Sequence, residues 1–136
     1  MSNAGGGSNA PTYPVPWKLY KAANAPATGL VLFWFPANEN EVKNSSLRQS
    51  RALSLYAAQC IAMEVADTKI PNADKLVGDS KLPVAVLATP DGTPVKKVEN
   101  ANGKLKVGDV EKVVDGEMKQ RETSLDREFG NREFDV

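Results

Sequence analysis

The sequence contains no histidine and a single cysteine, Cys60, among its 136 residues. Without histidine, neither a serine–histidine nor a cysteine–histidine nucleophile can be assembled, and a zinc site is not expected. Internal disulfides are excluded because they require two cysteines. We therefore expect the chain to bind no metal and no cofactor, and any thiol chemistry depends on Cys60.

Charge of one sign and long apolar runs are also missing. Seventeen Lys and Arg residues balance seventeen Asp and Glu residues, and no basic block stands out. This balance argues against nucleic acid or an anionic membrane surface as a partner. No apolar stretch approaches the roughly 20 residues that a membrane-spanning helix needs, so no membrane span is expected. The composition, 41% hydrophobic and 25% charged, is that of a soluble globular domain.

The chain divides into three parts by composition. Residues 1–10 (MSNAGGGSNA) are typical of a cloning remnant followed by a flexible linker. Residues 11–122 form one domain, and residues 123–136 form a C-terminal helical extension or a flexible tail. Such a remnant would hide the native N-terminus, so a cytoplasmic and an exported location both stay open. A fragment of a larger exported protein is a further alternative, and the oligomeric state is open.

Strands are predicted from apolar and alternating segments. The continuous apolar run LVLFWF at 30–35 predicts a strand buried on both faces, as in parallel sheets. The proline-rich lead-in PTYPVPWKLY predicts an irregular segment or a short edge strand. Three later segments have strand patterns, and the turn PDGTP joins the last two into a hairpin: IAMEVADT, LPVAVLAT and VKKVEN.

Helices are predicted between the strands and at the end of the chain. Asn44, Ser45 and Ser46 are candidate N-caps for the segment LRQSRALSLYAAQC. A short helix in PNADKLVGDSK would end at Gly78. The last helix has an apolar stripe formed by Val110, Val113, Val114 and Met118.

Four stretches together suggest a known architecture. Leu30–Trp34 leads into a polar loop, Asp67 ends a strand, Leu82-Pro83 precedes a strand, and Val107–Glu111 begins the last helix. In their order and spacing, over roughly residues 17–120, they resemble the thioredoxin-like superfamily. The resemblance implies an α/β fold with a central mixed sheet flanked by helices, in the order β-α-β-α-β-β-α, and a cis-proline at Pro83.

The chain departs from that family at its chemical positions. The two cysteines of the C-x-x-C motif fall on Asn38 and Glu41, the tryptophan before them on Ala37, and the buried aspartate on Leu32. Dithiol–disulfide exchange requires one thiolate to attack and a second thiol to resolve the mixed disulfide. The resemblance therefore implies a divergent member that lacks the C-x-x-C oxidoreductase site.

In the family, the cis-proline loop and the loop after the first strand form one surface that binds extended polypeptide. Backbone hydrogen bonding at such a surface needs no cysteine. We therefore expect a redox-inactive module for protein or peptide binding, or a structural module. Alternatively, Pro83 only defines a turn. The expected contact surface consists of Ala37, Asn38, Glu39, Asn40, Glu41, Leu82 and Pro83.

Four aromatic residues near the two ends are secondary candidates for partner or dimer contacts. Packing of the lead-in and of the tail explains them equally well. They are Trp17, Tyr20, Phe129 and Phe134.

Two further groups could carry chemistry. Cys60 could serve a one-cysteine peroxidase or glutathione-linked enzyme, or it could pack as a small apolar side chain beneath the sheet. The structural interpretation is favoured because Cys60 falls near the C-terminal end of a helix, whereas reactive cysteines are favoured at N-terminal ends. Glu39 and Glu41 form a carboxylate pair, but a loop reading N-E-N-E predicts solvated, ordinary carboxylates. No catalytic residue is expected apart from the Cys60 alternative.

Overall fold

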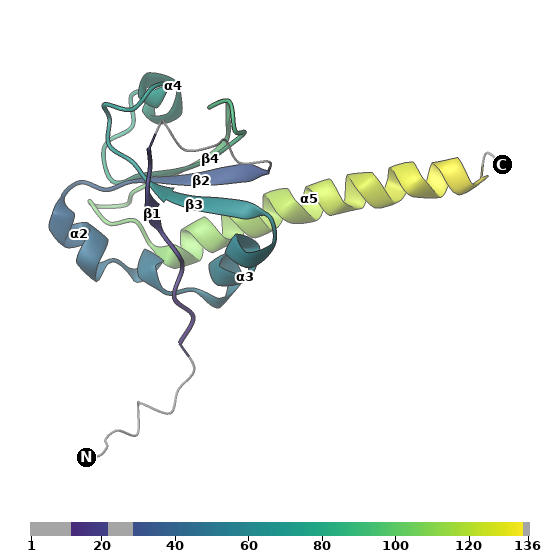
Figure 1. Ribbon diagram of the computed structural model, residues 1–136, viewed down its shortest axis with the longest axis horizontal. Helices are drawn as coiled ribbons and strands as arrows, with labels where there is room; N and C mark the ends of the chain where they lie inside the picture. Colours follow the sequence, from purple (N-terminus) through teal and green to yellow (C-terminus); the bar gives the residue numbers. More distant parts are fainter. Residues whose placement is uncertain (1–11, 22–28, 135–136) are drawn as a thin grey trace, which may run out of the picture.

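The protein is built around a five-stranded mixed sheet in the order β1-β3-β2-β4-β5 (Figure 1). The structure, a computed structural model, describes residues 12–21 and 29–134, with side chains as far as residue 122. The α/β class and the mixed sheet are as expected, whereas the predicted linker at 1–10 lies outside the described residues. The strands are β1 (Lys18–Leu19), β2 (Leu30–Phe35), β3 (Ile61–Val65), β4 (Val84–Ala88) and β5 (Pro94–Glu99).

The strand directions divide the sheet into two halves. β1 and β2 both run parallel to β3, so β2 and β3 form the expected β-α-β unit, and β1 is the short edge strand expected in the lead-in. β4 runs antiparallel to β2, and β5 pairs with β4 as a hairpin. Gly92 has a φ of 90° in the hairpin turn, a left-handed conformation that glycine adopts without a steric penalty.

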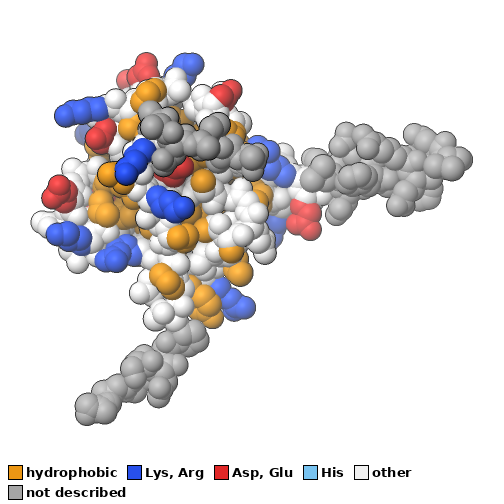
Figure 2. Space-filling view, in the orientation of Figure 1, with side chains coloured by type: hydrophobic (Ala, Val, Ile, Leu, Met, Phe, Trp, Pro, Cys, Tyr) orange, Lys and Arg blue, Asp and Glu red, His pale blue; other side chains and the backbone are white. Residues whose placement is uncertain are grey.

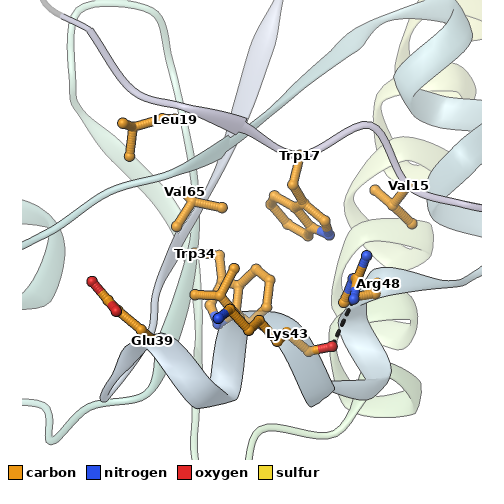
Figure 3. Close-up of a pocket in the computed structure, with 9 residues that line it drawn as sticks. Val15, Trp17, Leu19, Trp34, Glu39, Lys43, Arg48 and Val65 are labelled. Atoms are coloured by element: carbon orange, nitrogen blue, oxygen red, sulfur yellow. Dashed lines mark hydrogen bonds between the residues drawn. The ribbon is translucent and has the colours of Figure 1, made fainter.

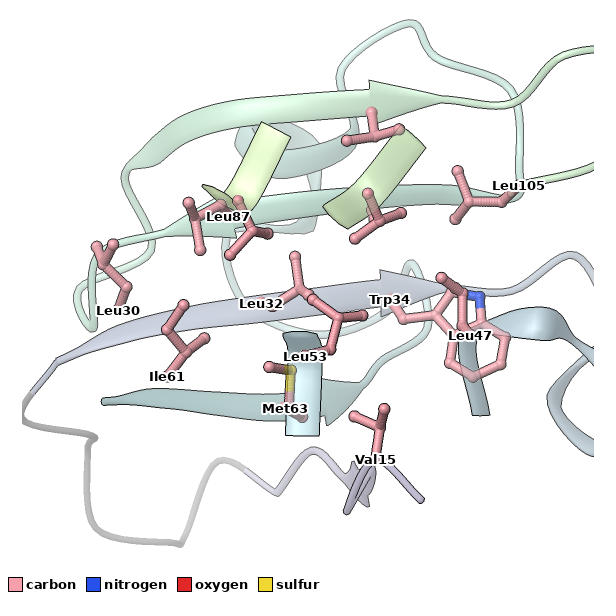
Figure 4. Close-up of a cluster of buried hydrophobic side chains, with 14 residues drawn as sticks. Val15, Leu30, Leu32, Trp34, Leu47, Leu53, Ile61, Met63, Leu87 and Leu105 are labelled. Atoms are coloured by element: carbon pink, nitrogen blue, oxygen red, sulfur yellow. The ribbon is translucent and has the colours of Figure 1, made fainter. Parts of the chain in front are cut away.

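Both faces of the sheet are covered by helices (Figure 1). α3 (Arg51–Gln59) and α5 (Val107–Phe134) cover one face, and the short α4 (Ala73–Val77) covers the other. All six residues of β2 are buried, as the apolar run predicted. Because successive side chains of a strand point to opposite faces, Leu32 and Trp34 enter the core beneath α3 and α5 (Figure 4), and Val31 and Phe33 enter the core beneath α4.

The closing helix α5 is held by its apolar stripe. Val110 and Val114 are fully buried, and Val113 and Met118 pack at the margin of the same core, as predicted. The helix continues to Phe134 and projects beyond the sheet (Figure 1). Within the described residues, no helix is long and apolar enough to cross a bilayer.

The predicted start of the helix after β2 is wrong. The segment is divided into α2 (Glu39–Asn44), a 3₁₀ turn η1 (Ser46–Arg48) and α3, each with its own cap. The side chains of Asn38, Ser45 and Ser50 each accept a hydrogen bond from a backbone N–H group, in α2, η1 and α3 respectively. Asn44 ends α2 instead of beginning a helix, because the fully buried Leu47 brings the chain back to the core between α2 and α3.

Candidate functional site

The two parts of the predicted contact surface, residues 37–41 and Leu82-Pro83, lie at the same end of the neighbouring strands β2 and β4. Phe35 at the end of β2 pairs with Val84 at the start of β4, so the segment after β2 emerges beside Leu82-Pro83. The Leu82–Pro83 peptide bond is cis. Residues 37–40 are exposed, whereas Leu82 is half-buried and Pro83 is buried. The surface therefore exposes the side chains of its first half and only part of its second.

Hydrogen bonds already hold the Pro83 side of this edge. The side-chain amide of Asn100 donates to the carbonyl of Lys81 at 2.9 Å and to the carbonyl of Pro83 at 3.1 Å. Asn100 follows β5, so the loop before β4 is tied to the far end of the hairpin. This loop is consequently a fixed wall of the surface.

Glu41 is not the solvated loop carboxylate that the N-E-N-E pattern predicted. One carboxylate oxygen accepts the indole N–H of Trp34 at 3.2 Å, and the other accepts the backbone N–H of Ala37 at 2.9 Å. Trp34 is fully buried, so its indole N–H cannot bond to water, and Glu41 provides the acceptor that this group needs. Glu39, two residues earlier, is exposed. The pair therefore divides into a structural carboxylate and a surface carboxylate.

The prediction that Cys60 packs beneath the sheet is wrong, because its side chain is exposed. A helix that continued through Cys60 would place it on the face of Leu53 and Tyr56, but α3 ends at Gln59, and Cys60 has a non-helical φ of −157°. Ile61 directly after it pairs with Leu30, at the start of β2. Cys60 thus lies at the other end of the strands from Ala37–Glu41, and the six residues of β2 separate the two places by about 20 Å.

A cleft that no sequence pattern indicates opens between the lead-in and α2 (Figure 3). Its volume is about 490 Å³. Four separate segments contribute to it, so no single stretch of sequence indicates it. The cleft is lined by Val15, Trp17, Leu19, Trp34, Glu39, Val42, Lys43, Arg48 and Val65.

Two of the four secondary aromatic candidates, Trp17 and Tyr20, have packing roles. Trp17 packs edge-on against Trp34 with ring centroids 5.2 Å apart, and its indole N–H donates to the carbonyl of Leu47 at 2.8 Å. Tyr20 packs against Phe33 on the other face, with centroids 5.8 Å apart. The side chains of Phe129 and Phe134 lie outside the described part of the chain.

No family model matches the chain, and no curated protein matches it either. Among the residues that the structure describes, no three His, Cys, Asp or Glu side chains come together in a group that could hold a metal ion. The function is therefore inferred from the geometry of the site.

Proposed function

We propose that the protein is a divergent, redox-inactive member of the thioredoxin-like superfamily that acts as a protein- or peptide-binding module, or as a structural module. The order of β2, α3, β3, α4, β4, β5 and α5 supports the thioredoxin-like assignment, since it is the order that the resemblance implies. Asn38 and Glu41 stand at the C-x-x-C positions, and neither side chain can attack a disulfide.

One observation carries the binding proposal. The pairing of Phe35 with Val84 sets the exposed segment 37–40 beside the rigid loop at Leu82-Pro83. Glu41 and Asn38 fix the exposed segment from within, through hydrogen bonds to the backbone of Ala37 and Glu41. A partner that meets such a preformed surface loses less conformational entropy in ordering it than at a mobile loop.

The proposal is tested by selecting random peptides of about 12 residues against the protein and then measuring their affinity for variants. Ala37→Arg and Asn40→Arg place bulky charges on the proposed surface at exposed positions. Leu55→Arg is the matched control, because Leu55 is 51% exposed on α3, outside the surface. We expect the selected peptides to lose affinity for the first two variants and to keep it for the control. Failure to enrich any peptide, or equal affinity for all variants, would refute the binding module.

Exposure of Cys60 favours a second candidate, the one-cysteine thiol enzyme, which requires an accessible and readily ionised thiol. Its position at the C-terminal end of α3 disfavours it, because reactive cysteines are favoured at helix N-terminal ends. The candidates are separated by the rate at which Cys60 reacts with a disulfide reagent near pH 6, in the folded and in the urea-unfolded protein. We expect the folded protein to react no faster than the unfolded chain. A clearly faster folded protein would support the enzyme.

A further inference from the structure

The cleft beside β1 has the dimensions of a small-molecule site. Its volume of about 490 Å³ falls within the range of about 300–1,000 Å³ that ligand pockets occupy. In Figure 3, Trp17 and Leu19 reach into it from the lead-in, Val65 from the end of β3, and Lys43 from α2. Figure 2 shows apolar side chains at the surface of this face with Lys and Arg side chains among them.

The apolar part of the cleft is preformed. Trp17 is fixed by its hydrogen bond to Leu47 and by its edge-on contact with Trp34. Both indole N–H groups are already engaged, one with Leu47 and the other with Glu41. The half-buried ring of Trp17 therefore offers the cleft apolar contact area without a free donor, with the buried ring of Trp34 behind it, which suits a flat apolar group.

Charge in the cleft is asymmetric. Glu39 lies at one end, and Lys43 and Arg48 lie toward the other (Figure 3). One guanidinium nitrogen of Arg48 donates to the carbonyl of Lys43 at 2.6 Å, which directs the group along the cleft wall. Across the described residues, neither cation forms an ion pair with a carboxylate within 4.0 Å, since the sole pair joins Arg121 and Glu117.

We propose that this cleft binds a small organic anion with a flat apolar body, whose carboxylate meets Arg48 and Lys43. Arg48 keeps most of its N–H donors for a planar carboxylate, the partner that its fork geometry matches. The site goes beyond the proposed peptide surface and shares only Glu39 with it.

An added peptide strand fits this place less well. β1 is an edge strand of two residues, and the two prolines just before it, Pro14 and Pro16, offer no backbone N–H to a new strand. Pro14 is, in addition, already bridged to Gln49.

The chain has two tryptophans, and both line the cleft, so the proton–nitrogen NMR signals of their side chains report on it directly. The probes are 2-naphthoate and the neutral 2-naphthalenemethanol, which have the same flat body. We expect 2-naphthoate to shift the Trp17 indole signal saturably, with half-saturation below about 1 mM. We expect the neutral probe to bind about 25-fold more weakly, because it lacks two partly exposed ion pairs, each with an effect of about fivefold.

Variants with matched controls assign the effect to the cleft. Arg48→Gln and Lys43→Gln should each weaken 2-naphthoate binding about fivefold and leave the neutral probe unchanged, whereas Lys75→Gln on α4 should change neither. Leu19→Ser should weaken the binding of both probes, and Leu55→Ser should weaken the binding of neither. Leu19 and Leu55 are 68% and 51% exposed, so both variants should fold.

An absent or unsaturable Trp17 shift, equal affinity for the two probes, or equal effects of Lys75→Gln and Arg48→Gln would overturn the proposal. The peptide selection tests the other surface separately.

Discussion

Replacing Glu41 with alanine tests whether the carboxylate beneath the exposed segment is structural. The side chain makes two hydrogen bonds, to the indole N–H of Trp34 and to the backbone N–H of Ala37. Alanine removes both acceptors. Ala37 is exposed and regains water, but the fully buried Trp34 keeps its N–H without an acceptor.

The expected loss follows from that difference. Leaving one buried donor unsatisfied costs about 1–3 kcal/mol, and loss of a solvent-exposed hydrogen bond adds about 0.5 kcal/mol. We therefore expect Glu41→Ala to lower the free energy of unfolding by about 2 kcal/mol. Glutamine keeps one acceptor oxygen and should fall between alanine and the parent protein.

Urea unfolding followed by tryptophan fluorescence measures the loss. With a denaturant dependence of about 1–3 kcal/mol per molar urea, a loss of 2 kcal/mol moves the midpoint down by about 1 M. Glu39→Ala is the matched control, because Glu39 lies in the same helical turn and is exposed. It should change the free energy by less than about 0.5 kcal/mol. Equal midpoints for the two variants would show that the Trp34 contact contributes nothing to stability.

Two further predictions concern the helices that cover the sheet. Burial and a 2.6 Å hydrogen bond to Asp115 raise the pKa of Tyr56 from 10.0 to about 12, so its stabilising contribution is complete below about pH 10 and is lost as the pH rises toward 12. In urea titrations, the Tyr56→Phe variant should lose less stability over this pH range than the parent protein, and equal losses would contradict the raised pKa of Tyr56. Gly116 is exposed within α5 with open space at its Cβ position, whereas a Cβ at Gly29 would lie 2.5 Å from the carbonyl oxygen of Cys60. Gly116→Ala should therefore stabilise the protein by about 1 kcal/mol, and Gly29→Ala should destabilise it by about 1–3 kcal/mol. Melting temperatures that shift in the same direction for the two variants would contradict this prediction.

The sequence indicates the sheet well because its signal is local. The apolar run in β2 and the turn at Asp91-Gly92 each determine their structure within a few residues. The boundaries of the helices after β2 depend instead on distant contacts. Ser50, for example, caps the start of α3 while its hydroxyl donates to Glu111, 61 residues away, at 2.5 Å.

The site was less predictable than the sheet. Its position after β2 follows from the resemblance, and Asn38 followed by an acidic residue three positions later is a helix-start signal that could have indicated α2. The role of Glu41 could not be read from the sequence, because it depends on the depth of Trp34. The cleft could not be read either, since the lead-in, the end of β3 and the α2–η1 segment come together only in the folded chain.

The burial of β2 on both faces has a consequence for how this protein tolerates mutation. Alternate β2 residues belong to two separate cores. A destabilising substitution at one position therefore disturbs the packing beneath α3 and α5, and one at the next position disturbs the packing beneath α4. A saturation scan should therefore find no permissive position among its six residues. β5, by contrast, has four exposed positions out of six, so labels and cross-linkers can be placed on it with less disturbance than on β2.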